Sequence, residues 1–173
     1  MAGKGSRGGK GGGPAGRVVA HILIIEARYY EDVADELAAG AVAELTARGA
    51  TYERIAVPGA LEIPQVLALA FNKEFEDFLD DTASPFDGAI ALGCVIRGET
   101  SHYDVVCGNT NHWLMHHATI NATPVGNAIL TVDSKEQAMT RAKGGRDGKG
   151  GDAARACLRL VEIARRFREV DEE

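Results

Sequence analysis

Four short apolar runs, each rich in β-branched residues, divide the chain. Because each run is shorter than most helices, we predict four buried strands, at residues 18–25, 51–57, 88–96 and 125–132. Apolar positions recur every three or four residues in the segments between and after these strands. This spacing predicts helices over 33–48, from Leu61 to about Phe78, from His102 to Ile120, over 135–142, and from Asp152 to about Phe167.

Turn and capping residues indicate where several helices begin and end. Gly49 is expected to end the first helix, and Ser134 with Gln137 matches a capping box at the start of the fourth. The glycine-rich stretch 144–151 indicates a linker before the last helix. That helix is expected to bury Ala156, Leu160, Ile163 and Phe167 and to expose Arg155, Arg159, Arg165, Arg166 and Arg168.

Strands that alternate with helices require a parallel sheet joined by right-handed crossovers. We therefore predict an α/β protein, a three-layer α/β/α sandwich around a four-stranded parallel sheet. Ligands of such sheets bind beyond the carboxyl ends of the strands. The positions to inspect for chemistry are thus 27–30, 58–62, 97–102 and 127–132.

The length of 173 residues suits one domain, which we place at 17–173. Residues 1–16 are half glycine and carry three cations and no acid, so we expect a flexible tail there. The whole chain has a formal charge of −6, and the part after the tail is more acidic still. An acidic body argues against nucleic acid as the main partner.

No apolar run approaches the roughly 20 residues of a membrane helix, and residues 1–16 lack the apolar centre of a secretory signal. We expect no membrane partner and a cytosolic location. Cys94, Cys107 and Cys157 are an odd number at spacings that fit neither a disulfide framework nor a zinc knuckle. Buried, reduced thiols are the expected state of all three.

The turn from Arg97 to His102 joins a strand end to a helix start. Free backbone N–H groups, a hydroxyl and the helix dipole can together hold an anion there, and phosphate is the natural candidate if the Glu99 carboxylate points outward. An ordinary capped turn is the alternative. His102 can move protons near pH 7, or it can simply cap the helix or face solvent.

Two other positions at strand ends carry candidate chemistry. Glu62, after the Pro58-Gly59 turn, can accept hydrogen bonds from the hydroxyls of a polyol, or it can be a carboxylate that the helix dipole favours. Tyr29 and Tyr30 offer a flat face to a planar ring, or they are surface or interface aromatics.

Two further patterns fail as specific sites. His112 and His116 have the spacing of two metal ligands on one helix face, but no nearby carboxylate or third ligand accompanies them, so a polar face or subunit contact is favoured. The stretch 144–150 resembles a P-loop only superficially: Lys143 stands where the first glycine belongs, Gly150 where Ser or Thr is needed. It can still bring Arg141 and Lys149 to an anion.

Four blocks of the chain, in this order, resemble the lumazine synthase family over about residues 17–168. They are VPGALEIP at 57–64, ALGCVIRGETSHY at 91–103, the segment from Pro124 to Thr131, and EQA at 136–138 with Arg141-Ala142. The resemblance implies a flavodoxin-like fold and a transferase of riboflavin biosynthesis. This activity condenses 5-amino-6-(D-ribitylamino)uracil with 3,4-dihydroxy-2-butanone 4-phosphate to 6,7-dimethyl-8-ribityllumazine, releasing phosphate and water without metal or organic cofactor.

The resemblance also implies roles for individual residues. By similarity, Tyr29 stacks on the pyrimidine and Val95 and Ile96 line the ring pocket, while His102 moves protons and Arg141 clamps the phosphate. The remaining expected substrate-binding residues are Ala60, Leu61, Glu62, Cys94, Glu99, Thr100, Asn127 and Lys149.

Family members assemble as pentamers with active sites between adjacent subunits, and some close into icosahedral shells. The resemblance thus favours a homo-pentamer, and 144–151 lies where shell contacts are made.

Two residues depart from the family pattern: Asn127 stands where many relatives have a phenylalanine that closes the neighbour's pocket, and Tyr29 where Phe or Trp is usual. Because of Asn127, a flavin- or lumazine-binding oligomer with little turnover is the alternative function. An RNA-associated protein that uses the tail and the arginines of 155–168 is a weaker third reading.

Overall fold

A computed structural model describes residues 16–71 and 84–171. Four strands form one parallel sheet in the order β2-β1-β3-β4. The strands are β1 (His21–Ala27), β2 (Thr51–Val57), β3 (Gly88–Ile96) and β4 (Val125–Val132). The predicted three-layer α/β/α sandwich is confirmed. The expected tail falls on residues outside the described ranges, apart from Gly16.

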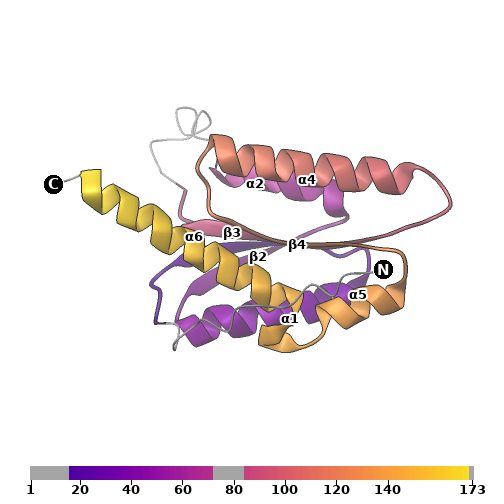
Figure 1. Cartoon of the computed structure of the whole chain (residues 1–173), viewed down its shortest axis with the longest axis horizontal. Coiled ribbons are helices and arrows are strands. Elements are labelled where there is room, and N and C mark those ends of the chain that lie inside the picture. The colour runs from indigo at the N-terminus through magenta and orange to yellow at the C-terminus, as the bar shows by residue number, and fades with distance from the viewer. Residues whose placement is uncertain (1–15, 72–83, 172–173) are drawn as a thin grey trace, which may run out of the picture.

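Helices cover both faces of the sheet (Figure 1). One face carries α1 (Glu31–Arg48), α5 (Lys135–Ala142) and α6 (Lys149–Asp171), and the other carries α2 (Ile63–Phe71) and α4 (His102–Ile120). Short 3₁₀ turns occupy Ala60–Glu62 and Gly145–Asp147. The expected helix from Leu61 to about Phe78 is α2 as far as Phe71, and its remainder lies outside the described residues.

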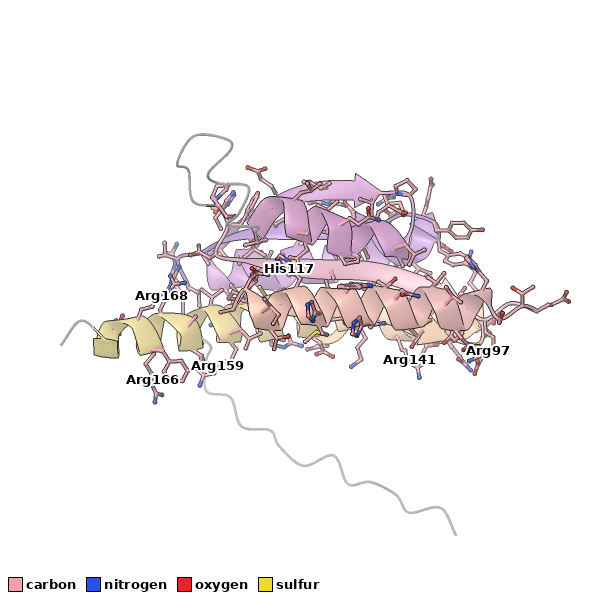
Figure 2. The ribbon with its side chains drawn as sticks, turned by 90° about the horizontal axis from the view of Figure 1, so that it is seen from above. Arg97, His117, Arg141, Arg159, Arg166 and Arg168 are labelled. Atoms are coloured by element: carbon pink, nitrogen blue, oxygen red, sulfur yellow. The ribbon has the colours of Figure 1, made fainter. Side chains whose placement is uncertain are left out.

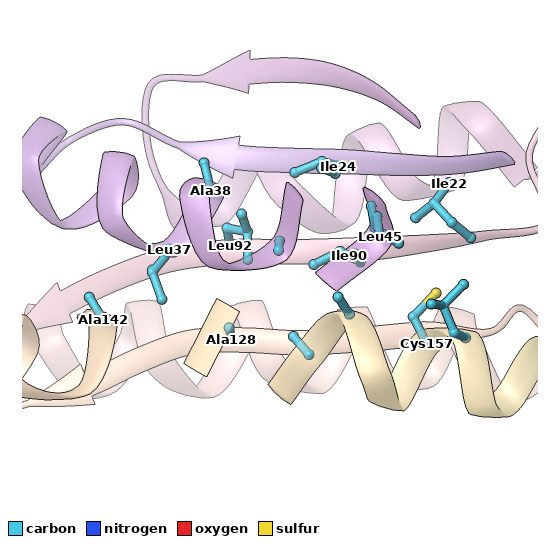
Figure 3. Close-up of a cluster of buried hydrophobic side chains, with 14 of the residues drawn as sticks. Ile22, Ile24, Leu37, Ala38, Leu45, Ile90, Leu92, Ala128, Ala142 and Cys157 are labelled. Carbon is cyan, nitrogen blue, oxygen red and sulfur yellow. The ribbon is translucent and has the colours of Figure 1, made fainter. Parts of the chain in front are cut away.

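Alternation along the strands divides the core between the two faces. Ile22 and Ile24 point toward α1 and α6, whereas Leu23 and Ile25 pack under α2 and α4. Figure 3 shows the first of these clusters, in which Leu37 and Leu45 of α1 meet the sheet. The first strand begins at His21 and not at Val18, because Val18 donates its N–H to Arg48 O before the ladder starts.

Two of the predicted helix caps, Gly49 and Ser134, are present at the expected positions. Gly49 follows α1 with a φ of 75°, a conformation that favours glycine, and its N–H bonds the last carbonyls of the helix. Ser134 caps α5 by accepting from Gln137 N. The second half of the expected capping box differs, since Gln137 Oε1 accepts from Asp133 N, one residue earlier.

The predicted linker between α5 and α6 is shorter than 144–151, because it ends at Gly148. Residues 145–147 form a turn, and α6 starts at Lys149. Gly150 and Gly151 lie so close to α1 and to the turn that a Cβ would meet Leu37 O at 1.9 Å and Arg146 O at 2.1 Å. These glycines allow close packing of backbones, which is a second use of glycine besides flexibility.

The predicted buried stripe of α6 is also wrong. Ala156 is exposed, as are Leu160 at 42% and Phe167 at 63%, and Ile163 is only half-buried. The buried residues are instead Ala153, Ala154, Cys157, Leu158 and Val161. A Cβ on Gly126 of β4 would lie 2.0 Å from Ala153 O, so helix and strand approach too closely for large side chains. The close contact with Gly126 therefore favours burial of the face of α6 that begins with the small residues Ala153 and Ala154.

Candidate active site

A cavity of about 320 Å³ opens at the carboxyl ends of β1, β2 and β3. The predicted residues Tyr29, Ala60, Leu61, Glu62, Cys94, Val95, Ile96, Thr100 and His102 line it. This is the edge of the sheet where the parallel fold predicts a ligand site. Side chains from three separate connections therefore share one space.

Tyr29 and Tyr30 form one wall of the cavity. They follow β1, and their rings meet edge to face with centroids 4.9 Å apart. Tyr29 is 74% exposed, so its ring is available to a planar ligand. Burial raises the pKa of the Tyr30 phenol, with smaller contributions from neighbouring side chains.

The turn after β2 holds Glu62 at the cavity. Pro58-Gly59 ends the strand, and the 3₁₀ turn that follows is closed when Glu62 Oε2 accepts from Gly59 N at 2.8 Å. This hydrogen bond fixes the carboxylate, and its other oxygen, Oε1, is left to accept from a ligand hydroxyl.

The floor of the cavity is the end of β3, where Cys94, Val95 and Ile96 lie. Burial raises the pKa of the Cys94 thiol to about 11. Cys94 is therefore protonated at neutral pH and acts as an apolar wall and not as a nucleophile.

The turn after β3 presents an open helix end to the cavity. Ser101 precedes α4, but its side chain does not cap the helix, and the Thr100 hydroxyl accepts from His102 N at 3.4 Å. His102 is exposed at this rim. Backbone N–H groups, the helix dipole and a hydroxyl thus converge where an anion can bind.

Four predicted site residues do not line the cavity of their own chain: Glu99, Asn127, Arg141 and Lys149. Arg141 bonds Gln137 O at 3.4 Å on exposed α5, and Lys149 pairs with Asp152 at 2.8 Å. Asn127 Nδ2 donates to Asn111 Oδ1 at 2.8 Å, and its Oδ1 accepts from Ile129 N. Glu99 is exposed.

Comparison with known proteins identifies the family. The family model of 6,7-dimethyl-8-ribityllumazine synthase matches residues 19–165. The chain belongs to the 6,7-dimethyl-8-ribityllumazine synthase family. It is thus an enzyme, a transferase of riboflavin biosynthesis, and as a member of this family it acts on small molecules and forms oligomers.

Individual relatives agree with this assignment. 6,7-Dimethyl-8-ribityllumazine synthase 1 of Rhodopseudomonas palustris is 50% identical over 148 residues, which cover 86% of this chain and 88% of the relative. The synthase of Azorhizobium caulinodans is 49% identical over 159 residues, covering 91% and 95%. That of Agrobacterium fabrum is 47% identical over 147 residues, covering 85% and 96%.

Sequence reasoning missed the lining residues Tyr103 and Val106, left Tyr30 as a candidate only, and included Gly59 and Gly98 only as parts of the turns at 58–62 and 97–102. Tyr103 and Val106 lie on the first turns of α4. Val106 follows His102 by four residues and Tyr103 by three, so helical spacing could have placed Val106 beside both. Gly59 and Gly98 border the cavity through their backbone, which no side-chain pattern signals.

His112 and His116 were considered above as a pair of metal ligands. Their rings stack with centroids 5.9 Å apart on exposed α4. Within residues 16–71 and 84–171, no group of three or more His, Cys, Asp or Glu side chains could hold a metal ion. None of the helices in these same ranges is long and apolar enough to cross a membrane.

Proposed function

We propose that this lumazine synthase family member condenses 5-amino-6-(D-ribitylamino)uracil with 3,4-dihydroxy-2-butanone 4-phosphate. The products are 6,7-dimethyl-8-ribityllumazine, inorganic phosphate and water. One observation carries the proposal: a single cavity holds an exposed aromatic ring, an oriented carboxylate and an open helix N-terminus. These three features match a pyrimidine, a ribityl chain and a phosphate.

The uracil binds at the strand ends of β1, β2 and β3. Tyr29 stacks on the pyrimidine, and Val95 and Ile96 cover its other side with apolar surface. Glu62 accepts hydrogen bonds from ribityl hydroxyls through Oε1, since Oε2 is already used by Gly59 N. The backbone at Ala60 and Leu61 contacts the same chain of hydroxyls.

The ketone phosphate binds at the N-terminus of α4. Thr100 supplies its hydroxyl, the backbone of Glu99 and Thr100 supplies N–H groups, and Arg141 supplies the opposite charge. Lys149 is a weaker candidate for the same role, because Asp152 already holds its ammonium at 2.8 Å.

The chemistry consists of proton transfers between held substrates. The amine adds to the ketone, and loss of water gives an imine. Removal of a proton next to the imine lets phosphate leave by elimination, and the second amine then closes the ring with loss of water. His102 at the rim accepts and returns these protons, and holding both substrates together supplies much of the acceleration. No metal or organic cofactor is needed in this sequence of steps.

The complete site is proposed to lie between two chains of a pentamer. Arg141, Asn127 and Lys149 lie outside the cavity of their own chain, and in this proposal a neighbouring copy supplies these groups. The outer face of α2 and α4 supports the assembly: Leu69, Trp113 and Ile120 are exposed there beside a groove of about 610 Å³. Exposed aromatic and aliphatic side chains of this kind are typical of subunit contacts.

A second candidate function is a flavin- or lumazine-binding oligomer with little turnover. Asn127 favours it, because its amide is held by Asn111 and Ile129 and presents a polar group where many relatives have a phenylalanine. Tight flavin binding with equal rates for the wild type and His102→Ala would favour this candidate over catalysis.

A dual-substrate assay tests the proposed function. Purified protein mixed with both substrates should release phosphate and form the fluorescent lumazine faster than buffer does, and Arg141→Ala should slow both signals together. A wild type that does not exceed the buffer rate would contradict the proposal.

We also propose a cytosolic location. Cys94 and Cys157 are buried free thiols, which suit a reducing compartment. Cell fractionation should recover the protein with cytosolic markers, and recovery with a secreted or membrane fraction would contradict this location.

A further inference from the structure

Arg97 is the first residue after β3, next to the turn that forms the anion end of the cavity, yet it does not line the cavity. Its guanidinium is engaged elsewhere. Nε lies 3.3 Å from Asp133 Oδ1, and Nη1 lies 3.5 Å from Asp104 Oδ1. The guanidinium carbon sits 4.1 Å from the centre of the Tyr103 ring.

Both carboxylates belong to helix starts at the same edge of the sheet. Asp104 is in the first turn of α4, and Asp133 directly precedes Ser134, the capping residue of α5. Negative charge at these positions stabilises the helices through their dipoles. The same negative charge repels a phosphate at the N-terminus of α4. The carboxylates therefore stabilise the helices but weaken anion binding at this edge.

The sheet holds Arg97 between the start of α4 and the start of α5. Its backbone N–H donates to Val132 O at 2.9 Å, which joins the ends of β3 and β4. From this point one side chain reaches both carboxylates. It also covers a face of Tyr103, which lines the cavity beside Thr100 and His102.

We propose that Arg97 is a positioning residue that cancels the charge of Asp104 and Asp133 and fixes the Tyr103 ring, so that the anion end of the cavity stays attractive to phosphate. This inference rests on the proposed function, since it assigns the phosphate to the N-terminus of α4. Arg97 itself does not touch the substrate. It acts through the two carboxylates and the aromatic ring.

Removal of the cation should affect one substrate selectively. In Arg97→Ala, two carboxylates remain unbalanced near the phosphate, and the KM for the ketone phosphate should rise about fivefold at low ionic strength. The rise should shrink at high salt, because the groups are exposed and screened. The KM for the ribitylaminouracil and kcat should change by less than about twofold, since Tyr29 and Glu62 follow β1 and β2, whereas Arg97 joins the ends of β3 and β4.

Removing the carboxylates as well should restore phosphate affinity. The triple variant Arg97→Ala, Asp104→Asn, Asp133→Asn should return the KM for the ketone phosphate to within about twofold of the wild type. Arg97→Lys, which keeps the charge, should also stay within about twofold. If Arg97 served only to hold the fold together, neither variant would restore the KM for the ketone phosphate. The triple variant in particular removes still more contacts.

Arg166→Ala is the matched control, since it removes the same charge from the far end of the molecule (Figure 2). It should leave both KM values unchanged. Binding of inorganic phosphate, measured by calorimetry, gives a second readout that needs no turnover: Arg97→Ala should weaken it about as much as it raises KM.

The outcomes separate the inference from the proposed function. An inactive wild type that still binds inorganic phosphate more tightly than Arg97→Ala contradicts the proposed function and supports the role of Arg97. An active wild type with equal rises in both KM values, no rescue in the triple variant, or an equal effect of Arg166→Ala overturns the inference.

Discussion

Gly150 packs against the backbone of Leu37 so closely that a Cβ on Gly150 would lie 1.9 Å from the Leu37 carbonyl oxygen. This contact brings the first turn of α6 against α1, and Gly40 makes a similar approach to Gly145 O. The glycine-rich stretch is thus the point at which two helices of one layer meet.

Gly150→Ala should therefore destabilise the protein although alanine is the better helix former. The backbones must separate to admit the methyl group, at a cost of about 2 kcal/mol or more. Thermal unfolding measures the loss. Gly108→Ala is the matched control, because Gly108 is also helical and has no atom within 4 Å of its added Cβ. That variant should be as stable as the wild type or more so, and equal losses in both would contradict the packing account.

The glycine stretch shows what the sequence could not reveal about the fold. The hydrophobic period correctly predicted the four strands, the helices between them and their order within the described residues, though not every boundary, because apolar spacing follows from which faces are buried. It failed at α6, where a run of glycines and small residues signals close packing only when the partner backbone is known. Leu160 and Phe167 were expected inside because they share a helical period with Ala156 and Ile163, whereas the structure exposes both and buries Ala153 and Cys157 against Gly126.

The candidate site divides in a similar way. Motifs at strand ends predicted Tyr29, Glu62, Thr100 and His102, because parallel strands bring their carboxyl ends to one edge. The charge balance around Arg97 was not predictable, because it depends on how the start of α4 lies beside Asp133, which follows β4. Arg141 does not line the cavity of its own chain, and no pattern within one sequence shows whether a neighbouring copy brings it there, as we propose.

A buried carboxylate anchors the segment before α6. Glu44 of α1 is fully buried and accepts from Arg146 Nε at 2.8 Å and Arg155 Nη1 at 3.2 Å. Arg146→Ala with Arg155→Ala should destabilise the protein, because it leaves the buried carboxylate without a counter-charge.

Glu44→Gln should cost less than the loss of both arginines, since the half-exposed arginines can regain water. Denaturant unfolding of the two variants, with exposed Glu53→Gln as control, ranks these effects. A larger loss for Glu44→Gln than for the double arginine variant would contradict the account.

His117 is expected to lower the stability of the folded protein when the pH becomes acidic. Burial, together with the nearby His116, lowers the pKa of His117 from its ordinary 6.5. The folded protein therefore holds the neutral ring, and the stabilisation is present above about pH 6.5 and lost as the pH falls through the lowered value.

His117→Gln should weaken this loss between pH 7.5 and pH 5.5, as measured by urea unfolding. His112→Gln, on the exposed face of the same helix, should retain the acid loss of the wild type. Parallel pH profiles for the wild type and His117→Gln would show that the acid loss has another origin.

Glu62 is expected to select the ribityl chain. Glu62→Gln keeps the hydrogen bond from Gly59 N but weakens the bonds to ligand hydroxyls, so the KM for the ribitylaminouracil should rise about tenfold. The KM for the ketone phosphate should stay within about twofold. Steady-state kinetics with Glu53→Gln as control checks this, and an equal rise for both substrates would count against a ribityl contact.

The central claim is that each site takes His102 from one chain and Arg141 from another, and subunit mixing tests it most directly. His102→Ala and Arg141→Ala are each expected to be nearly inactive as pure assemblies. When the two are co-assembled in equal amounts, half of the chains supply each intact group, so about a quarter of the sites should hold both, and activity should return to about a quarter of the wild type. If mixed assemblies form and stay as inactive as the pure variants, His102 and Arg141 act within the same chain and the shared site is wrong.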